Sequence, residues 1–239
     1  MFKTIYVGLY IVLYIIVLFP KLWKINKLEK HGKIEKMNSL LHQIAYKWGK
    51  ATVNITGSKI LVSGLENIPE GPVLFVGNHQ GYFDIPILYT SIPKPISFVA
   101  KMELGNIPIF GAWMKKQRCI FIDRENPRQS LKAIQEGVKS LKEGHSMVIF
   151  PEGTRSKGHD MNEFKKGSLK MATKAKVPIV PITIDGSYKI LEENKNRIKA
   201  SEVKLTISKP IYTENLSKEE ENELTEKIYE IIQNNLNKQ

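Results

Sequence analysis

A histidine and an aspartate lie five residues apart in the stretch NHQGYFD, Asn78 to Asp84, which directly follows the apolar run VLFV. Histidine titrates near neutral pH, and a nearby carboxylate can fix its tautomer and stabilise the imidazolium, so the pair could act as a general base. On a continuous helix, residues five positions apart diverge by about 140°. We therefore expect His79 to precede the first full turn of a helix, with Asp84 reaching back to it. A histidine satisfied in the core or exposed on the surface is the alternative.

The sequence predicts neither a metal site nor a nucleophile belonging to the enzyme. The other four histidines show no ligand spacing with His79, and there is no cysteine pair. No G-x-S-x-G elbow, Walker A loop or G-x-G-x-x-G motif occurs, and the single cysteine, Cys119, lies in an apolar run typical of the core. A His–Asp pair without its own serine indicates a triad whose hydroxyl comes from the substrate, as in acyl transfer to an alcohol without a covalent enzyme intermediate.

Two more polar clusters also follow apolar runs directly. Asp123 and Arg124 follow CIFI, and the stretch PEGTR, which contains Glu152, Thr154 and Arg155, follows MVIF. If these runs are parallel strands, all three clusters meet at one edge of the sheet, where ligands bind in open α/β folds. Arginines form bidentate bonds with phosphate, and a glycine such as Gly153 allows close backbone approach. The clusters therefore indicate a site for a phosphate-bearing substrate, with structural ion pairs as the alternative.

The elements that position these clusters are short apolar runs alternating with helical patterns. Several runs are apolar at every position, which is typical of strands covered on both faces in a mainly parallel sheet. A helix is expected after the Asn126 cap, a basic one over 163–175, and a last one after the capping box SKEE that begins at Ser217. The fold class expected is α/β, a mainly parallel mixed sheet flanked by helices. The runs cover residues 60–62, 73–76, 96–100, 119–122, 147–150, 178–184 and 203–207.

The N-terminal segment indicates a membrane. Residues 5–19 are uncharged and mostly apolar, yet shorter than the about 20 residues of a full span, so a short or tilted span or an embedded anchor is expected. A signal peptide is a rival, although no small-residue cleavage site follows, and a buried core helix is another. If the segment spans, the lysines that follow place the rest of the chain on the cytoplasmic face of the cell membrane.

The positive charge is concentrated in the same region. Of the net charge of +12, residues 1–50 carry +7, from nine lysines and two glutamates. One helix is expected over 22–48, with lysines distributed around it among lipid headgroups. Charge alone also permits nucleic acid, but no nucleic-acid-binding motif occurs, so none is expected as a partner. We expect a two-helix membrane-anchoring motif over 1–50 and a catalytic domain over 51–239.

Four stretches in order resemble a known family. NHQGYFD fits an N-H-x-x-x-x-D motif, and IFIDR, FPEGTRS and VPIVPI fit the second, third and fourth motifs. Over roughly residues 55–215 the chain resembles the 1-acyl-sn-glycerol-3-phosphate acyltransferases of the glycerolipid acyltransferase superfamily. The stretch VAKMEL, which contains Lys101, also looks like the family's segment after its first helix.

The resemblance implies a role for each matching residue. His79 would take the proton from the sn-2 hydroxyl of lysophosphatidate, and Asp84 would orient His79. Arg124, Glu152 and Arg155 would belong to the acceptor site, with the arginines on its phosphate. Gly153 and Thr154 would shape that loop, and Lys101 would lie near the site as a candidate donor to the oxyanion.

The resemblance also implies the reaction and its partners. The product would be phosphatidate, the acyl donor would be acyl-carrier protein thioester or acyl-CoA, and neither metal nor other cofactor would be needed. A two-helix N-terminal membrane motif occurs in bacterial members of the family. The alternatives left open are glycerol 3-phosphate or another lysolipid as the acceptor, and a catalytically dead membrane-binding protein on the same fold.

Overall fold

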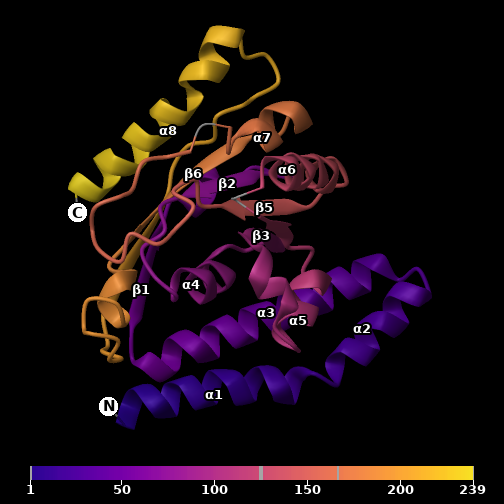
Figure 1. Cartoon of the computed structure of the whole chain (residues 1–239), viewed down its shortest axis with the longest axis vertical. Helices are drawn as coiled ribbons and strands as arrows, with labels where there is room; N and C mark the ends of the chain where they lie inside the picture. Colours follow the sequence, from indigo (N-terminus) through magenta and orange to yellow (C-terminus); the bar gives the residue numbers. More distant parts are fainter. Residues whose placement is uncertain (1, 124–125, 166, 239) are drawn as a thin grey trace.

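The computed structural model describes residues 2–123, 126–165 and 167–238. In the part of the chain that it describes, seven strands form one sheet in the order β1-β7-β6-β2-β5-β3-β4 (Figure 1). All neighbouring strands run parallel except β6 and β7, so the mainly parallel mixed sheet predicted from the sequence is confirmed. The strands are β1 (Lys59–Ser63), β2 (Leu74–Gly77), β3 (Ile96–Lys101), β4 (Ile120–Ile122), β5 (Ser146–Ile149), β6 (Ile179–Asp185) and β7 (Glu202–Ile207).

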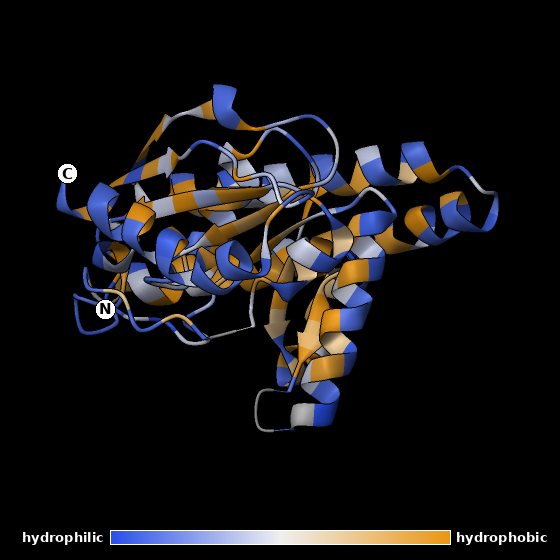
Figure 2. Ribbon diagram, turned by 90° about the horizontal axis from the view of Figure 1, so that it is seen from above, coloured by the Kyte–Doolittle hydropathy of each residue, from blue (hydrophilic) through white to orange (hydrophobic). Residues whose placement is uncertain are grey.

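Helices cover both faces of this sheet, as the uniformly apolar strands require. Along β2, Phe75 packs into a core with α3 and α4, while Leu74 and Val76 pack into a second core with α6, α7 and α8. Figure 2 shows the largely hydrophobic strands enclosed between helices whose outer turns are hydrophilic. The helices and short 3₁₀ turns are α1 (Phe2–Leu18), α2 (Lys21–Lys30), α3 (Ile34–Thr56), η1 (Leu65–Asn67), α4 (Asp84–Ser91), η2 (Met102–Asn106), α5 (Phe110–Lys116), α6 (Pro127–Lys142), α7 (Lys170–Ala175), η3 (Ser187–Ile190) and α8 (Lys218–Asn237).

Two of the helix starts expected from the sequence are confirmed. The Asn126 side chain accepts the backbone N–H groups of Arg128 and Gln129 at the start of α6. Ser217 and Glu220 form a reciprocal capping box at the start of α8. Each cap satisfies backbone donors that the first helical turn leaves without partners, which explains why local sequence sufficed to place them.

The expected helix over 163–175 is wrong in its first half, because only α7 is helical. Gly167 has a φ of +91°, which interrupts a right-handed helix. Upstream of it, the Lys165 N–H donates to the Pro151 carbonyl at 3.0 Å, and the Asn162 N–H donates to the Glu152 carboxylate at 2.8 Å. These two bonds hold the segment before Gly167 against the loop after β5 in a non-helical conformation.

The single helix expected over residues 22–48 is also wrong. The chain forms α2 and α3, which are separated at Gly32, where φ is +67° and the Lys33 N–H turns back to the Leu28 carbonyl at 2.9 Å. The division expected between residues 50 and 51 lies inside α3, which continues to Thr56 and is capped by the left-handed Gly57. Leu22 and Ile25 of α2 pack with Leu41 of α3, which fixes α2 to the rest of the molecule.

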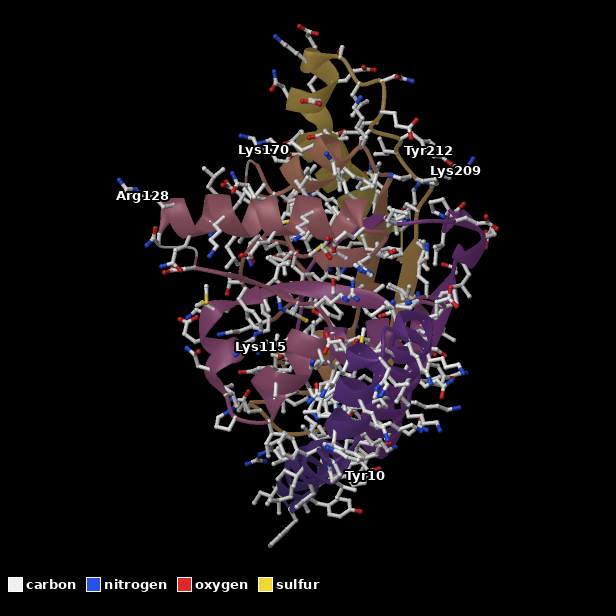
Figure 3. The ribbon with its side chains drawn as sticks, turned by 90° about the vertical axis from the view of Figure 1, so that its right-hand side faces the viewer. Tyr10, Lys115, Arg128, Lys170, Lys209 and Tyr212 are labelled. Carbon is white, nitrogen blue, oxygen red and sulfur yellow. The ribbon has the colours of Figure 1, made fainter. Side chains whose placement is uncertain are left out.

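The outer face of α1 is apolar and exposed. Its inner face is held by Val7, which is buried, and by Lys3, whose ammonium group donates to the Thr56 carbonyl at 2.9 Å. Among the described helices, none is by itself long and apolar enough to cross a bilayer, whereas α1 and α2 together, bent by 40° at their junction, meet those criteria. Figure 3 shows α1, with Tyr10, far from α6 (Arg128) and α7 (Lys170). Membrane attachment stays a prediction.

The topology brings five strand ends to one edge. Because β4, β3, β5, β2 and β6 are mutually parallel, their carboxyl ends point the same way. The segments that leave this edge include the residues after β2, the loop after β5 and the turn into η3 (Figure 1). Polar residues from distant parts of the sequence therefore meet where open α/β sheets bind ligands.

Candidate active site

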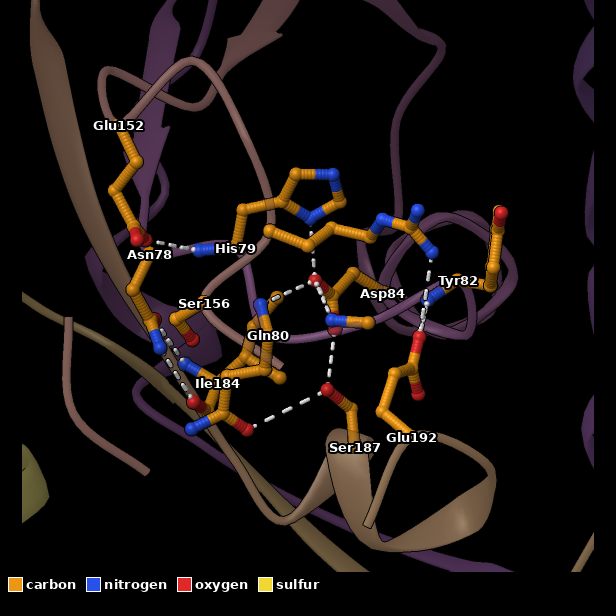
Figure 4. Close-up of polar contacts among 12 residues, drawn as sticks. Asn78, His79, Gln80, Tyr82, Asp84, Glu152, Ser156, Ile184, Ser187 and Glu192 are labelled. Carbon is orange, nitrogen blue, oxygen red and sulfur yellow. Dashed lines mark hydrogen bonds and ion pairs between the residues drawn. The ribbon is translucent and has the colours of Figure 1, made fainter. Parts of the chain in front are cut away.

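The His79–Asp84 pair is formed by a short connection between β2 and α4. The strand ends at Gly77, and Asp84 is the first residue of the helix, so His79 precedes the helix as its spacing predicted. The His79 Nδ1 atom lies 2.6 Å from the Asp84 carboxylate oxygen Oδ2 (Figure 4). The intervening turn is compact enough for the aspartate to reach back over it.

The environment of Asp84 fixes the tautomer of the imidazole. The aspartate is fully buried, and its Oδ2 also accepts the backbone N–H groups of Gln80 at 2.8 Å and Gly81 at 3.0 Å. Because Oδ2 accepts all of these bonds, Nδ1 is the nitrogen that carries the proton in the neutral imidazole, which leaves Nε2 as the acceptor. That second nitrogen points away from Asp84 in Figure 4, and the ring, whose side chain is 19% exposed, stacks on Phe150 at a centroid distance of 4.2 Å.

Glu152 joins the loop after β5 to the histidine. It is 3% exposed, and its Oε1 accepts the His79 backbone N–H at 2.6 Å. Its Oε2 accepts both the backbone N–H and the side-chain amide of Asn162. Burial raises the pKa of the Glu152 carboxyl, although the hydrogen bonds from Asn162 and His79 oppose the shift. In this structure Glu152 holds the backbone of the segment Asn78 to Asp84 in place.

The rest of the PEGTR loop also lies against the backbone of His79. Gly153 has a φ of +76°, which lets the chain turn directly after Glu152. Thr154 is exposed at the tip of this turn. Two residues later the Ser156 N–H donates to the His79 carbonyl at 2.7 Å, so the loop is bonded to the histidine backbone on both sides of its turn.

Arg155 is held between an aromatic ring and a carboxylate. The centre of its guanidinium group lies 3.5 Å from the centroid of the Tyr82 ring, and its Nη1 lies 3.5 Å from Oε1 of Glu192. That same oxygen accepts the Tyr82 backbone N–H at 2.8 Å. Burial raises the pKa of the Glu192 carboxyl, while the Tyr82 N–H and the Arg155 charge oppose the shift. Arg155 uses one edge for this pairing and retains further N–H donors.

The remaining residues expected in the site have separate positions. Lys101 ends β3 at the same edge of the sheet, and its ammonium group pairs with Glu103 at 2.6 Å. Arg124 lies outside the residues that the structure describes. The structure thus brings together His79, Asp84, Glu152 and Arg155 through direct contacts with the segment Asn78 to Asp84, and it places Lys101 on the same sheet edge.

Several residues of this network were not identified from the sequence. Gln80, inside the heptapeptide, accepts the Gly186 N–H, while Ser187 and Glu192 come from the segment after β6 and bond to Asp84 and to the Tyr82 N–H. The rule that located the other clusters applies here as well, because Asp185-Gly186-Ser187 directly follows the apolar strand over 178–184. The same pattern of an apolar strand followed by polar residues therefore indicates Ser187 as a site residue.

Two other observations bear on the chemistry. Among the residues that the structure describes, no group of three or more histidine, cysteine or acidic side chains could hold a metal ion. Cys119 is 8% exposed in the core, and burial raises the pKa of its thiol to about 12. A thiol that stays protonated at neutral pH is a poor nucleophile, which agrees with the core position expected for it.

Comparison with known proteins gives a consistent result. The family model described as Acyltransferase matches residues 59–185, more than half of the chain. The chain belongs to the acyltransferase family. The resemblance found in its four motifs is thereby confirmed, and the matched segment contains all four of them.

The relatives of this acyltransferase include proteins named for one activity. It is 40% identical over 151 residues to a probable 1-acyl-sn-glycerol-3-phosphate acyltransferase of Mycoplasma pneumoniae, an alignment that covers 61% of this chain and 56% of the relative. It is 36% identical over 190 residues to the protein of the same name from Mycoplasma genitalium. That alignment covers 74% of this chain and 70% of the relative. The chain thus spans between about half and 70% of the length of these relatives.

A solved structure resembles this acyltransferase along its whole length. The crystal structure of the 1-acyl-sn-glycerophosphate acyltransferase PlsC from Thermotoga maritima superposes with a TM-score of 0.82 and 26% sequence identity. The match covers 99% of this chain and 97% of that chain. The α/β sheet with its flanking helices is therefore shared by the two proteins.

Proposed function

We propose that this protein transfers a fatty acyl group from an acyl thioester to the sn-2 hydroxyl of 1-acyl-sn-glycerol 3-phosphate, which makes phosphatidate. The observation that carries the proposal is the oriented His79–Asp84 pair beside Arg155, a base next to a cation suited to phosphate. The acyl donor is acyl-carrier protein thioester or acyl-CoA. The names of the relatives and of the solved structure support the same reaction.

In this reaction the proton moves from the substrate hydroxyl to His79 and then to the leaving thiolate. Nε2 of His79 accepts the proton of the substrate hydroxyl while the oxygen attacks the thioester carbonyl. The resulting tetrahedral oxyanion collapses, the carbon–sulfur bond breaks, and the imidazolium returns its proton to the leaving thiolate. Asp84 stabilises the imidazolium in between. Lys101 and backbone amides are the candidate donors to the oxyanion.

The acceptor phosphate is assigned to the arginines. Arg155 lies beside Tyr82, and Ser156, the next residue, is bonded to the His79 carbonyl, so a phosphate held by Arg155 stays close to the base. Arg124 is assigned to the same phosphate on the strength of its motif. Gly153 and Thr154 form the turn that leads into Arg155, and Glu152 holds that turn against His79.

The N-terminal helices are assigned to the membrane surface. The exposed apolar residues of α1 include Leu9, Leu13 and Val17, and the exposed Trp23 follows on α2. A hollow of about 560 Å³ lies beside Trp23 and is lined mainly by lysines and His31. Apolar side chains that enter a leaflet beside lysines that meet anionic headgroups are typical of interfacial helices. The lysine excess supports the cytoplasmic face.

This assignment predicts an effect of acidic substitutions on α1. Leu9 and Val17 are 58% and 73% exposed, so Leu9→Glu with Val17→Glu should leave the fold intact while placing two charges in the apolar face. In flotation with vesicles of neutral and anionic phospholipid, the wild type should rise with the vesicles and the double variant should stay at the bottom. Leu131→Glu, which changes a 51% exposed leucine on α6, is the matched control and should float. A wild type that does not float contradicts the assignment.

The reaction is tested with purified protein in detergent. Lysophosphatidate is offered with acyl-carrier protein thioester in one series and acyl-CoA in another, and phosphatidate is measured by mass spectrometry. Product is expected with at least one donor. Glycerol 3-phosphate and a lysolipid without a terminal phosphate serve as competing acceptors, and faster acylation of either one would move the assignment to that acceptor. No product with any acceptor would support a catalytically dead protein instead.

A further inference from the structure

The two oxygens of the Asp84 carboxylate have different partners. Oδ2 accepts three hydrogen bonds, from Nδ1 of His79 and the backbone N–H groups of Gln80 and Gly81. Oδ1 accepts a hydrogen bond from the Ser187 hydroxyl (Figure 4). Both Asp84 and Ser187 are fully buried. Within the residues that the structure describes, Ser187 is therefore the donor that satisfies the second oxygen of this buried carboxyl group.

Ser187 reaches Asp84 because the catalytic segment is bonded along the end of β6. The Asn78 side chain pairs with both backbone groups of Ile184 at 2.8 Å, and the Gln80 side-chain carbonyl accepts the Gly186 N–H at 3.0 Å. Gly186 has a φ of +93°, and a Cβ there would lie 2.6 Å from the Glu202 carbonyl oxygen. The turn therefore requires glycine, and it delivers the next side chain, Ser187, to the carboxylate.

The Ser187 hydroxyl has one hydrogen and two acceptors within reach. Oδ1 of Asp84 is the nearer, and Oε1 of Gln80 lies at 3.4 Å. An ionised acceptor forms the shorter and stronger hydrogen bond, so the hydrogen goes to the carboxylate. With Oδ1 held by Ser187 from one side, the carboxylate cannot rotate without losing a bond, and Oδ2 stays directed at the imidazole.

We propose that Ser187 is a positioning residue for proton transfer: its hydroxyl holds the Asp84 carboxylate in the orientation in which Oδ2 binds Nδ1 of His79. This inference rests on the proposed function for its kinetic consequences, while the contact itself does not. Ser187 touches no reacting atom. It acts through Asp84 on the histidine, and it lies beyond the four motifs that carry the family resemblance.

Ser187→Ala is compared with Ser97→Ala. Ser97 is also a buried serine, 3% exposed, and donates to the Ser146 carbonyl at 3.3 Å in the sheet, away from the His79–Asp84 contacts. Ser187→Ala should lower kcat about 10-fold, a part of the about 10²–10⁴-fold that a general base contributes, and leave KM for lysophosphatidate within about twofold. Ser97→Ala should leave both constants close to those of the wild type.

A second readout needs no turnover. In protein with ¹⁵N-labelled histidine, the Nδ1–H proton of His79, identified by its loss in His79→Gln, reports the bond to Asp84. Its resonance should move upfield in Ser187→Ala and stay in place in Ser97→Ala. Ser187→Cys, which keeps the shape but offers only a weak donor, should lie between serine and alanine in kcat and serves if the alanine variant does not fold.

The outcomes separate this inference from the proposed function. A wild type that does not acylate lysophosphatidate refutes the reaction, and the histidine resonance still tests the contact. An active wild type whose kcat and histidine resonance are the same in Ser187→Ala refutes the positioning role. Equal losses in Ser187→Ala and Ser97→Ala would mean that Ser187 only stabilises the fold, and would also overturn it.

Discussion

Replacing His79 with alanine is expected to lower kcat for phosphatidate formation by about 10²–10⁴-fold, the range that a positioned general base contributes. The imidazole is the group that takes the hydroxyl proton, and no other titratable side chain is bonded to Asp84 in the described part of the chain. The ring is partly exposed and stacks on Phe150, so its removal should leave the fold largely intact. Steady-state kinetics with lysophosphatidate, together with the circular dichroism spectrum, measure the two effects.

A matched histidine makes this test specific. His159 also lies near an aspartate, with its Nδ1 3.6 Å from Asp160, but its side chain is 44% exposed and outside the network around Asp84. His159→Ala should keep wild-type turnover. Substantial residual activity in a folded His79→Ala protein would reject His79 as the base, and so would a comparable loss in His159→Ala.

Arg155→Ala should chiefly weaken the binding of the acceptor. A hydrogen bond to a charged group contributes about 1.5–3 kcal/mol, so KM for lysophosphatidate should rise about 10- to 100-fold. The proton-transfer pair does not involve Arg155, so kcat should change much less. Arg155→Lys keeps the charge but loses the planar fork and the flat contact with Tyr82, and should lie between the wild type and alanine.

Two comparisons separate the phosphate role of Arg155 from a general loss of charge. Arg128→Ala removes an exposed arginine on α6 and should leave KM unchanged. Tyr82→Phe keeps the ring under the guanidinium and should behave as the wild type, whereas Tyr82→Leu removes a cation–π contact of about 0.5–1 kcal/mol and should raise KM about two- to fivefold. An unchanged KM in Arg155→Ala would refute the assignment of the phosphate to this arginine.

The supporting contacts explain why such a site can be stable. Asp84 and Glu152 are both buried acids, yet each carboxylate accepts several hydrogen bonds, from the catalytic segment, from Ser187 and from Asn162. Buried charged groups persist only when their hydrogen-bonding capacity is met. The network therefore fixes the segment Asn78 to Asp84 and balances the burial of Asp84 and Glu152 at the same time.

Two helices expected from the sequence differ in the structure, because glycines or contacts with distant residues determine where each helix begins and ends. The residues over 163–169 have a helical pattern, but Gly167 has a positive φ, and the Lys165 N–H bonds to Pro151 in the loop after β5. The helix expected over 22–48 is divided at Gly32. Helical periodicity predicts which face of a segment is apolar, and it does not predict which backbone groups a neighbouring loop will take.

The sequence by itself determined what depends on neighbours along the chain. The His79–Asp84 pair spans only six residues, so its spacing between a strand and a helix was enough to predict the contact. The strands β2 and β5 were determined by their unbroken apolar runs, and the starts of α6 and α8 by their caps. These features rest on local geometry and on hydrophobic burial, both of which the order of residues encodes directly.

Only the tertiary structure decided which distant residues support the pair. Glu152 meets His79 across 73 residues, and Ser187 meets Asp84 across 103 residues, because β2 lies between β5 and β6 in the sheet. Strand order follows from how the helices pack over both faces, and no local pattern specifies it. The same order places the Glu152 carboxylate on the His79 backbone N–H, and it brings Glu192 to Arg155.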